Sequence, residues 1–436
     1  MYWWLRDVRP AAFLGLAIFV IAISRLGVIL VTPAADQNVD LSIYREVGEL
    51  LANGVDPYDF SSQEPLREKL RLNENGAHPY VKQTRMGYNY LVSANLPGST
   101  SFYGLLEIAF GDDDPRLWRV AFVLGDISIA LAAYFFLQHV GVALQAPAQK
   151  IAFAAGVVAY PSLIEWGTFW PAEKQFQTAL MLLLAGLLSA TPKRPLWAAA
   201  AIAVTGSQSI LFKALGVFLL SVALGYFRGR PLREFVVATL LFVLATIPFF
   251  FFFNQSFIQL LMDRAFSGSA SAAAQHGSPW VLLPYSWIVY ARPVVSAGLV
   301  AAILTSYLRN RIDLLNCMAA VELVFICVWT NSGSMDRMNV AMILGLMCIA
   351  TMSVQRWQAL TLFNFAIQAP IYTYIYVHHF RWNPLQDPER LDAWATAIFL
   401  VSYFCVLFFQ PRLRASPLTA GFPNRTSSQG KFDETG

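Results

Sequence analysis

The chain has 436 residues, of which 56% are hydrophobic and 13% are charged, and its formal net charge is +4. A soluble globular protein carries charge on roughly a quarter of its residues, because water must wet its surface. This composition excludes an ordinary water-soluble domain, and the small net charge gives no reason to expect a nucleic-acid partner.

Apolar runs of about 20 residues recur along the chain, and a helix of about that length crosses a bilayer core of ~30 Å. Because lipid offers backbone amides no water partners, spanning segments must be helices or a closed barrel, and continuous runs favour helices. The first run, Ala11 to Val31, is too long for the core of a signal peptide and contains Arg25, so we expect a retained first helix. We therefore predict an all-α polytopic membrane protein.

Basic residues gather in short loops at alternate ends of the runs, and cytoplasmic loops are enriched in Lys and Arg. This pattern predicts about 12 transmembrane helices with both termini in the cytoplasm. Residues 1–410 form the membrane domain, with a first outer loop at 33–115, and residues 411–436 form a disordered cytoplasmic tail. Residues 195–227 are too long for one span, so we expect a tight helix pair that turns near Ser207–Ser209.

The first outer loop contains two amphipathic stretches that suit the membrane interface. Apolar residues recur at helical spacing over residues 39–52, which predicts a helix just past the end of helix one. Asp40 lies at its start, where it is either a carboxylate that a lipid head group reaches or a residue favoured by the helix dipole. The second stretch, Phe102 to Phe110, is expected to lie on the bilayer surface.

Several ionisable residues lie within or at the ends of the predicted spans, where charge is costly and usually faces a partner or a cavity. Asp126 and Glu322 fit buried structural partners. The cations at outer helix ends either converge on a phosphate or extend to the lipid head groups. The ionisable residues in question are Arg25, Asp126, Glu165, Lys174, Lys213, Glu322 and Arg337.

The motifs of several other functions are missing from the sequence. There is no phosphate-binding glycine loop with its lysine, no nucleophile elbow and no His/Cys cluster with zinc spacing. The adjacent His378 and His379 point in different directions from a helix, so we predict neither a metal nor a cofactor. The four cysteines fall in predicted spans and are expected to pack as small apolar residues.

Residues 39–44 (VDLSIY) and 54–58 (GVDPY) together resemble the first outer loop of GT-C superfamily glycosyltransferases that use polyprenyl-phosphate sugars. The bacterial mannosyltransferase and arabinosyltransferase-like branch is the most similar. In that branch an Asp precedes a Tyr by one helical turn, and a Gly-x-x-Pro/Leu-Tyr turn follows. Residues 160–170 are similar to the family's Pro-containing loop between helices three and four, and residues 335–337 (MDR) to a motif that often reads His-Glu-Arg.

The resemblance implies a GT-C-like fold and an inverting hexosyl- or pentosyltransferase in the bacterial inner membrane. It would move a sugar from a polyprenyl-phosphate donor to a glycan or glycolipid acceptor on the extracytoplasmic side, among membrane lipids. Asp40 would be the catalytic base. The expected phosphate-binding residues are Lys174, Lys213, Arg264, His276 and Arg337. The expected substrate-binding residues are Tyr44, Arg45, Tyr58 and Glu165.

Three alternatives stay open at this point. A transporter or flippase for a lipid-linked glycan would also use basic groups in an apolar bundle, although paired repeats and charges through the middle of the bundle would suit it better. An O-antigen-type ligase or polymerase would usually place its large outer loop late in the chain, whereas the longest loop here follows helix one. A purely structural membrane subunit leaves the charges inside the spans unexplained.

Overall fold

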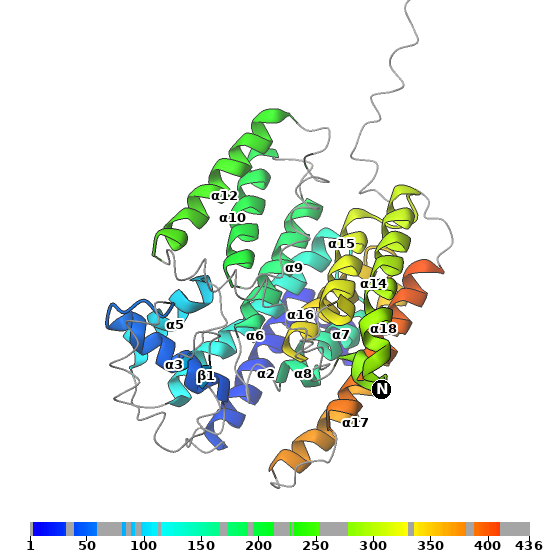
Figure 1. Cartoon of the computed structure of the whole chain (residues 1–436). Coiled ribbons are helices and arrows are strands. Elements are labelled where there is room, and N and C mark those ends of the chain that lie inside the picture. The colour runs from blue at the N-terminus through cyan, green and yellow to red at the C-terminus, as the bar shows by residue number, and fades with distance from the viewer. Residues whose placement is uncertain are drawn as a thin grey trace, which may run out of the picture.

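The computed structural model of the protein describes most of the membrane domain. The described residues are 3–31, 39–58, 81–83, 89–91, 97–111, 115–164, 173–190, 195–212, 227, 231–252, 278–329, 335–380 and 388–409. Within them the chain is almost entirely helical (Figure 1). The exception is a short antiparallel pair of strands, in which Val81 of β1 pairs with Leu91 of β2.

The first half of the chain contains the hairpin, the interfacial helices and the first spans. Its elements are α1 (Trp3–Asp7), α2 (Pro10–Val31), α3 (Val39–Ala52), β1 (Val81–Gln83), β2 (Asn89–Leu91), α5 (Pro97–Phe110), α6 (Pro115–His139), α7 (Pro147–Phe153), the π-helix η1 (Ala154–Val158), α8 (Pro161–Ile164), α9 (Lys174–Ala190) and α10 (Pro195–Phe212). Figure 1 shows α3, α5 and β1 gathered at one end of the molecule, close to α2 and α6.

The second half is helical throughout the described residues. Its elements are α12 (Leu232–Phe252), the 3₁₀ turn η3 (Pro279–Leu282), α14 (Tyr285–Leu308), α15 (Leu314–Leu323), the π-helix η4 (Val324–Trp329), α16 (Met335–Ile349), α17 (Val354–Phe380) and α18 (Pro388–Phe408). Helices α15, α16, α17 and α18 pack on one another, and α17 also packs on α7, η1 and α8.

Five helices in the described part of the chain are long and apolar enough to cross a membrane. They are Pro10–Val31, Arg116–His139, Leu232–Phe249, Tyr290–Leu308 and Leu391–Phe408. The apolar helices Leu314–Trp329 and Asn339–Ile349 are shorter. The prediction of an all-α, multi-pass membrane protein is confirmed, while the face of the membrane on which each terminus lies remains a prediction.

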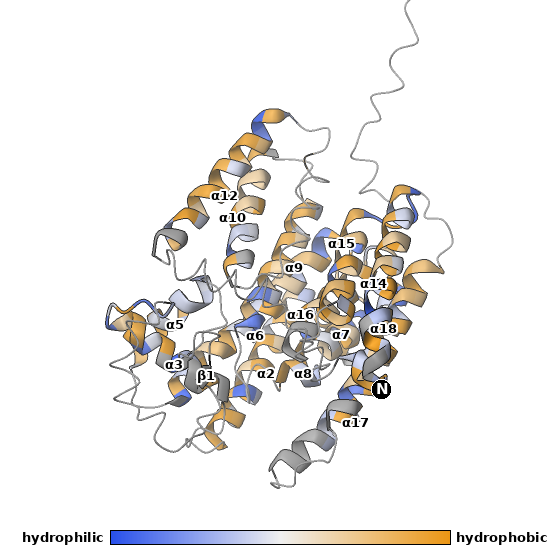
Figure 2. Cartoon of the chain, in the orientation of Figure 1, coloured by the Kyte–Doolittle hydropathy of each residue, from blue (hydrophilic) through white to orange (hydrophobic). Residues whose placement is uncertain are grey.

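The outer surfaces of these helices are apolar, as a lipid environment requires. Tyr290, Val294 and Leu308 of α14 are 77%, 72% and 73% exposed, and Leu232 and Leu244 of α12 are 74% and 66% exposed. Figure 2 shows apolar residues over much of the length of both helices. Surfaces of this size and polarity are rare on soluble monomers, so we assign these faces to the lipid.

The centre of the bundle is the packing of α6 against α9, where two glycines allow the helices to approach closely. A Cβ on Gly186 of α9 would lie 2.6 Å from the Phe135 ring, and one on Gly125 of α6 would lie 2.8 Å from the Cβ of Gln175. Small residues at a crossing let two membrane helices come into close contact. The Gly125 crossing brings the start of α9 against Asp126.

Most of the expected spans coincide with an observed helix or a pair of consecutive helices. The tight pair predicted for residues 195–227 is not formed as expected, because α10 runs without interruption through Ser207–Ser209 to Phe212. The Ser207 hydroxyl donates to the carbonyl of Val204 at 2.8 Å, so this serine bonds within the helix and does not end it. The remainder of the pair, residues 213–226, lies outside the described residues.

Lys150 joins the N-terminal segment to the bundle. It lies in α7, is 1% exposed, and its ammonium donates to the carbonyls of Leu5 and Val8, to the latter at 2.7 Å. Carbonyls at the end of a helix such as α1 lack amide partners within the helix. The lysine supplies donors to this segment and thereby fixes it to α7.

Candidate functional site

The α3 helix spans Val39–Ala52, which confirms the helix predicted over residues 39–52. Its apolar face is buried against α5 and α6, with Leu41, Tyr44 and Val47 at most 5% exposed. The Tyr44 ring stacks on the Tyr103 ring of α5, with centroids 4.3 Å apart and an interplanar angle of 11°. Such aromatic contacts contribute about 0.5–1.5 kcal/mol beyond the area that they bury. Helix α3 is therefore docked firmly on α5 and α6.

The turn after α3 is held by specific hydrogen bonds. Gly54 has a φ of 74°, a conformation that glycine adopts at little cost. Asp56 Oδ1 accepts a bond from the Tyr58 backbone amide at 2.9 Å, and the Tyr58 hydroxyl lies 2.6 Å from Thr100 Oγ1 of α5. Tyr58 is 1% exposed, so the five-residue turn is packed onto α5 rather than open to solvent.

Tyr103 of α5 connects the packed helices α3 and α5 to the start of α9. Its hydroxyl donates to Glu173 Oε2 at 2.8 Å, and both residues are fully buried. Burial, followed by the charge of Glu173, raises the pKa of Tyr103 well above its ordinary value, so the phenol remains a proton donor at neutral pH. Glu173 immediately precedes Lys174, the first residue of α9, whose side chain is 6% exposed.

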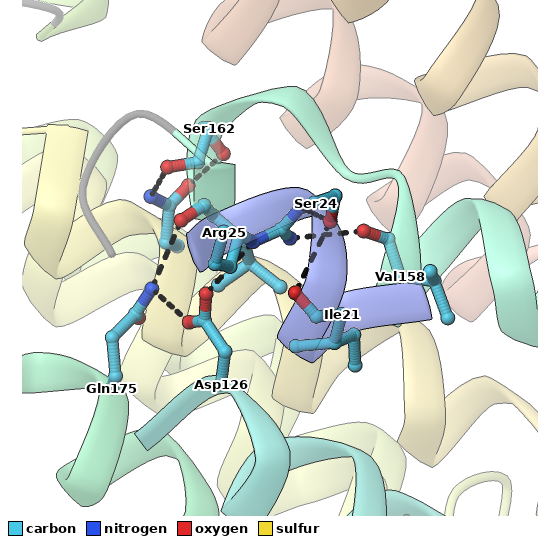
Figure 3. A network of polar contacts seen from close by, with 9 residues as sticks. Ile21, Ser24, Arg25, Asp126, Val158, Ser162 and Gln175 are labelled. Atoms are coloured by element: carbon cyan, nitrogen blue, oxygen red, sulfur yellow. Dashed lines mark hydrogen bonds and ion pairs between the residues drawn. The ribbon is translucent and has the colours of Figure 1, made fainter. Parts of the chain in front are cut away.

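A buried ion pair lies deeper in the bundle and uses the same end of α9 (Figure 3). Arg25 Nε of α2 donates to Asp126 Oδ2 of α6 at 3.1 Å, and the second carboxylate oxygen accepts from Gln175 Nε2 at 2.8 Å. The same guanidinium donates to the Val158 carbonyl at 2.9 Å. Gln175 also donates to the Leu163 carbonyl at 3.1 Å. Asp126 was expected to have a buried partner, and the structure identifies it as Arg25. Their hydrogen-bond network joins α2, α6, η1, α8 and α9.

A neighbouring pair extends the network to α16. The Ser162 hydroxyl of α8 donates to Asn339 Oδ1, and Asn339 Nδ2 donates to the Ser162 carbonyl at 3.1 Å. Figure 3 shows Ser162 close to the Arg25–Asp126 pair. Residues 160–164, at the beginning of the family-like loop, are therefore fixed from two sides, while the remainder of that loop lies outside the described residues.

The structure brings two of the predicted site segments together. Asp40 is the second residue of α3, and Lys174 is the first residue of α9. Between them lies the buried chain of contacts Tyr44–Tyr103–Glu173. Arg45, one position after Tyr44, is partly buried.

Of the other predicted site residues, the structure describes Arg337 and Tyr58. Arg337 lies in the first turn of α16, and Tyr58 packs on α5 as described above. Four predicted residues lie outside the described residues, and these are Glu165, Lys213, Arg264 and His276. Among the residues that the structure does describe, no group of three or more His, Cys, Asp or Glu is arranged to hold a metal ion.

Sequence reasoning did not select Tyr103, Glu173 or Gln175. A usable signal was present, since the polar run Glu173-Lys174-Gln175 directly precedes the apolar part of a span. Residues two positions apart at the start of a helix face different neighbours. Here Glu173 faces Tyr103 of α5, and Gln175 faces the Arg25–Asp126 ion pair.

Replacing Tyr103 by phenylalanine is expected to weaken the packing of α3 and α5 on the start of α9. We expect the free energy of unfolding to fall by about 1–3 kcal/mol, because the buried Glu173 loses a hydrogen-bond donor. Phenylalanine keeps the ring stack on Tyr44. The measurement is the melting temperature, together with the rate of proteolysis within residues 39–111. Tyr290→Phe, at an exposed position on α14, is the matched control. Equal melting temperatures for both variants would contradict a structural role for this hydrogen bond.

Comparisons with known proteins give little further information. No protein-family model matches the sequence. No curated protein matches it either. Among solved structures, the chain is similar to ArnT from Cupriavidus metallidurans bound to undecaprenyl phosphate, with 13% identity and a TM-score of 0.45. The alignment covers 94% of this chain and 77% of that chain.

Proposed function

We propose that this protein is an inverting glycosyltransferase that moves a sugar from a polyprenyl-phosphate donor to a glycan or glycolipid acceptor on the extracytoplasmic side of the bacterial inner membrane. The observation that carries the proposal is the attachment of α3 to the start of α9. Tyr44, one turn after Asp40, stacks on Tyr103, and Tyr103 bonds to Glu173 beside Lys174. A segment that begins with a carboxylate and a segment that begins with a lysine thus share one rigid support.

These two residue types are the ones that a single-displacement transfer requires. The acceptor hydroxyl loses its proton as its oxygen attacks the anomeric carbon, and a carboxylate at Asp40 would accept that proton. The polyprenyl phosphate leaves with additional negative charge, which a nearby cation stabilises. Lys174 is our candidate for this cation, and its position at the positive end of the α9 dipole favours an anion there.

The interfacial position of α3 and α5 suits a donor of this kind. Both helices bury one face against the bundle, and α5 leaves Leu105 and Ile108 exposed, at 64% and 72%. Large apolar side chains on the outer face of such a helix insert into the boundary between head groups and acyl chains. A lipid-linked sugar holds its phosphate at the same depth. Further residues complete the proposed site. Those proposed to bind the donor phosphate are Lys213, Arg264, His276 and Arg337. Those proposed to bind the substrates are Tyr44, Arg45, Tyr58 and Glu165.

The decisive experiment is transfer by the purified full-length protein from polyprenyl-phosphate mannose, arabinose or glucose to a membrane lipid extract. Sugar transfer is followed by mass spectrometry of the lipid product and by release of polyprenyl phosphate. The anomeric configuration of the product, determined by NMR, tests inversion. Lys174→Met is expected to slow transfer by about 10²–10³-fold, the usual cost of losing one group that stabilises developing charge.

The possible outcomes separate the proposal from its alternatives. Transfer from one donor with inverted configuration supports it. Transfer with retained configuration contradicts the single-displacement mechanism. If no donor is used, and reconstituted vesicles instead move a lipid-linked glycan between leaflets, the protein is a transporter and the proposal fails.

A further inference from the structure

The second half of the bundle contains a polar face that the proposed transfer site does not use. Buried residues with polar atoms recur along α17 at intervals of three or four, and each is at most 2% exposed. They are Trp357, Thr361, Asn364, Gln368 and Tyr372. Residues at this spacing share one side of a helix. Polar groups at membrane depth are costly and mark cavities or binding paths when they occur together.

Hydrogen bonds connect this face to two neighbouring elements. Asn364 Nδ2 donates to the Tyr160 hydroxyl at 2.7 Å, and Gln368 Nε2 donates to Asn364 Oδ1 at 3.3 Å. The Tyr372 hydroxyl donates to Asp392 Oδ1 of α18 at 2.8 Å. The connections place Tyr160, α17 and the start of α18 around one buried polar region.

Three buried carboxyl or amide oxygens in this region lack a hydrogen-bond donor among the described residues. They are Oε1 of Glu322, Oε1 of Gln368 and Oδ2 of Asp392, on residues that are 1%, 2% and 2% exposed. Glu322 and Asp392 both act electrostatically on Cys327, and Asp392 also acts on Tyr160, so both carboxyl groups lie in the surroundings of Cys327. An acceptor that stays unpaired in the interior is costly, because it has lost the hydrogen bonds that water provided. Three such acceptors in one region point to donors that come from outside the protein.

Two π-helices border the same region and provide an independent indication. Tyr160 follows η1 closely, Cys327 lies within η4, and Glu322 lies just before η4. π-Helical turns are rare and occur frequently at functional sites. In both segments a backbone carbonyl accepts a bond from a side chain elsewhere, with Val158 accepting from Arg25 and Val328 from Trp280 at 2.6 Å.

We propose that this polar region, defined by Tyr160, Glu322, Gln368, Tyr372 and Asp392, binds a neutral ligand rich in hydroxyl groups, such as a sugar ring. The three oxygens lack donors, while Trp357 Nε1 on the same face of α17 has no acceptor among the described residues. A hydroxyl group both donates and accepts, and it brings no negative charge to the two carboxyl groups. Among the described residues, no Lys or Arg acts on Glu322 or Asp392, which disfavours a phosphate at this position. Tyr160 and Tyr372 supply aromatic surface beside the acceptors. The region contains none of the residues proposed for sugar transfer, so it is a second site.

The rate at which Cys327 is chemically modified measures how easily small molecules reach this region. The measurement requires no sugar transfer. In full-length protein with Cys317, Cys348 and Cys405 replaced by alanine, Cys327 is treated with methyl methanethiosulfonate, a small neutral reagent. The matched control retains Cys348 alone, a cysteine of α16 that is 1% exposed, against 0% for Cys327. We expect Cys327 to react about tenfold faster or more, because access governs thiol modification at such sites.

Ligand binding is tested by protection of Cys327. Methyl mannoside or methyl arabinoside is expected to slow its modification several-fold, whereas 1,4-dioxane, a ring without hydroxyl groups, is not. Gln368→Leu and Glu322→Leu each remove an acceptor oxygen and are expected to abolish protection, while the melting temperature stays near that of the parent.

Two results would overturn the inference. If Cys327 reacts no faster than Cys348, the three oxygens are satisfied within the protein. If Cys327 reacts quickly but neither glycoside protects it, the region holds water only. Because no donor lipid is present, either result leaves the proposed transferase function unaffected.

Discussion

Replacing Asp40 by asparagine is expected to slow sugar transfer by about 10²–10⁴-fold, the usual contribution of a positioned general base. Asparagine keeps the size of the side chain and still accepts hydrogen bonds, but it does not take up the proton of the acceptor. Donor binding should therefore remain close to that of the wild type. Single-turnover transfer and donor binding, measured on the same preparation, separate the chemical step from recognition.

Asp56→Asn is the matched control for this prediction. It makes the same substitution in the same loop, and asparagine retains the oxygen that accepts from the Tyr58 amide. We expect its transfer rate to equal that of the wild type. Loss of a negative charge at the start of α3 costs at most about 1 kcal/mol, so the melting temperature of Asp40→Asn should change little. Wild-type transfer by Asp40→Asn would reduce Asp40 to a residue that favours the start of a helix.

Local patterns were sufficient to predict most of the helices. The run Ala11 to Val31 became α2, and the amphipathic pattern over residues 39–52 became α3, because both depend on hydrophobic spacing within one segment. The apolar pattern predicts a second amphipathic stretch from Phe102 to Phe110, but α5 begins earlier, at Pro97. Proline at the first position suits the start of a helix, and the sequence pattern of apolar residues does not report that position.

Contacts between distant segments were beyond the reach of such patterns. Asp126 was expected to have a buried partner, but the pattern within its own helix does not identify Arg25, which lies 101 positions away. The same holds for Tyr103 and Glu173, which are 70 positions apart. The turn expected at Ser207–Ser209 failed for a related reason, since serine is tolerated within a buried helix once its hydroxyl bonds to the preceding turn.

Breaking the Arg25–Asp126 pair from either side is expected to destabilise the protein by about 3–5 kcal/mol, because the remaining charge is then buried without compensation. Arg25→Met leaves a carboxylate that, among the described residues, accepts only from Gln175, and Asp126→Leu leaves a guanidinium without its carboxylate. The measurement is the melting temperature and the midpoint of denaturant unfolding in detergent. Arg309→Met, at an exposed position after α14, is the control and should change neither value.

The double variant Arg25→Met/Asp126→Leu tests what the pair is for. Replacing both charges by apolar side chains often restores the stability that a single replacement removes. Some loss should remain, since the Val158 carbonyl then lacks the donor that Arg25 provides. If the double variant regains stability and also transfers sugar, the pair only joins α2 to α6. If it regains stability but transfers slowly, the pair sets the position of Gln175 and hence of the start of α9, where Lys174 is proposed to meet the donor phosphate. A double variant as unstable as the single variants would contradict the assumption that the cost comes from unpaired charge.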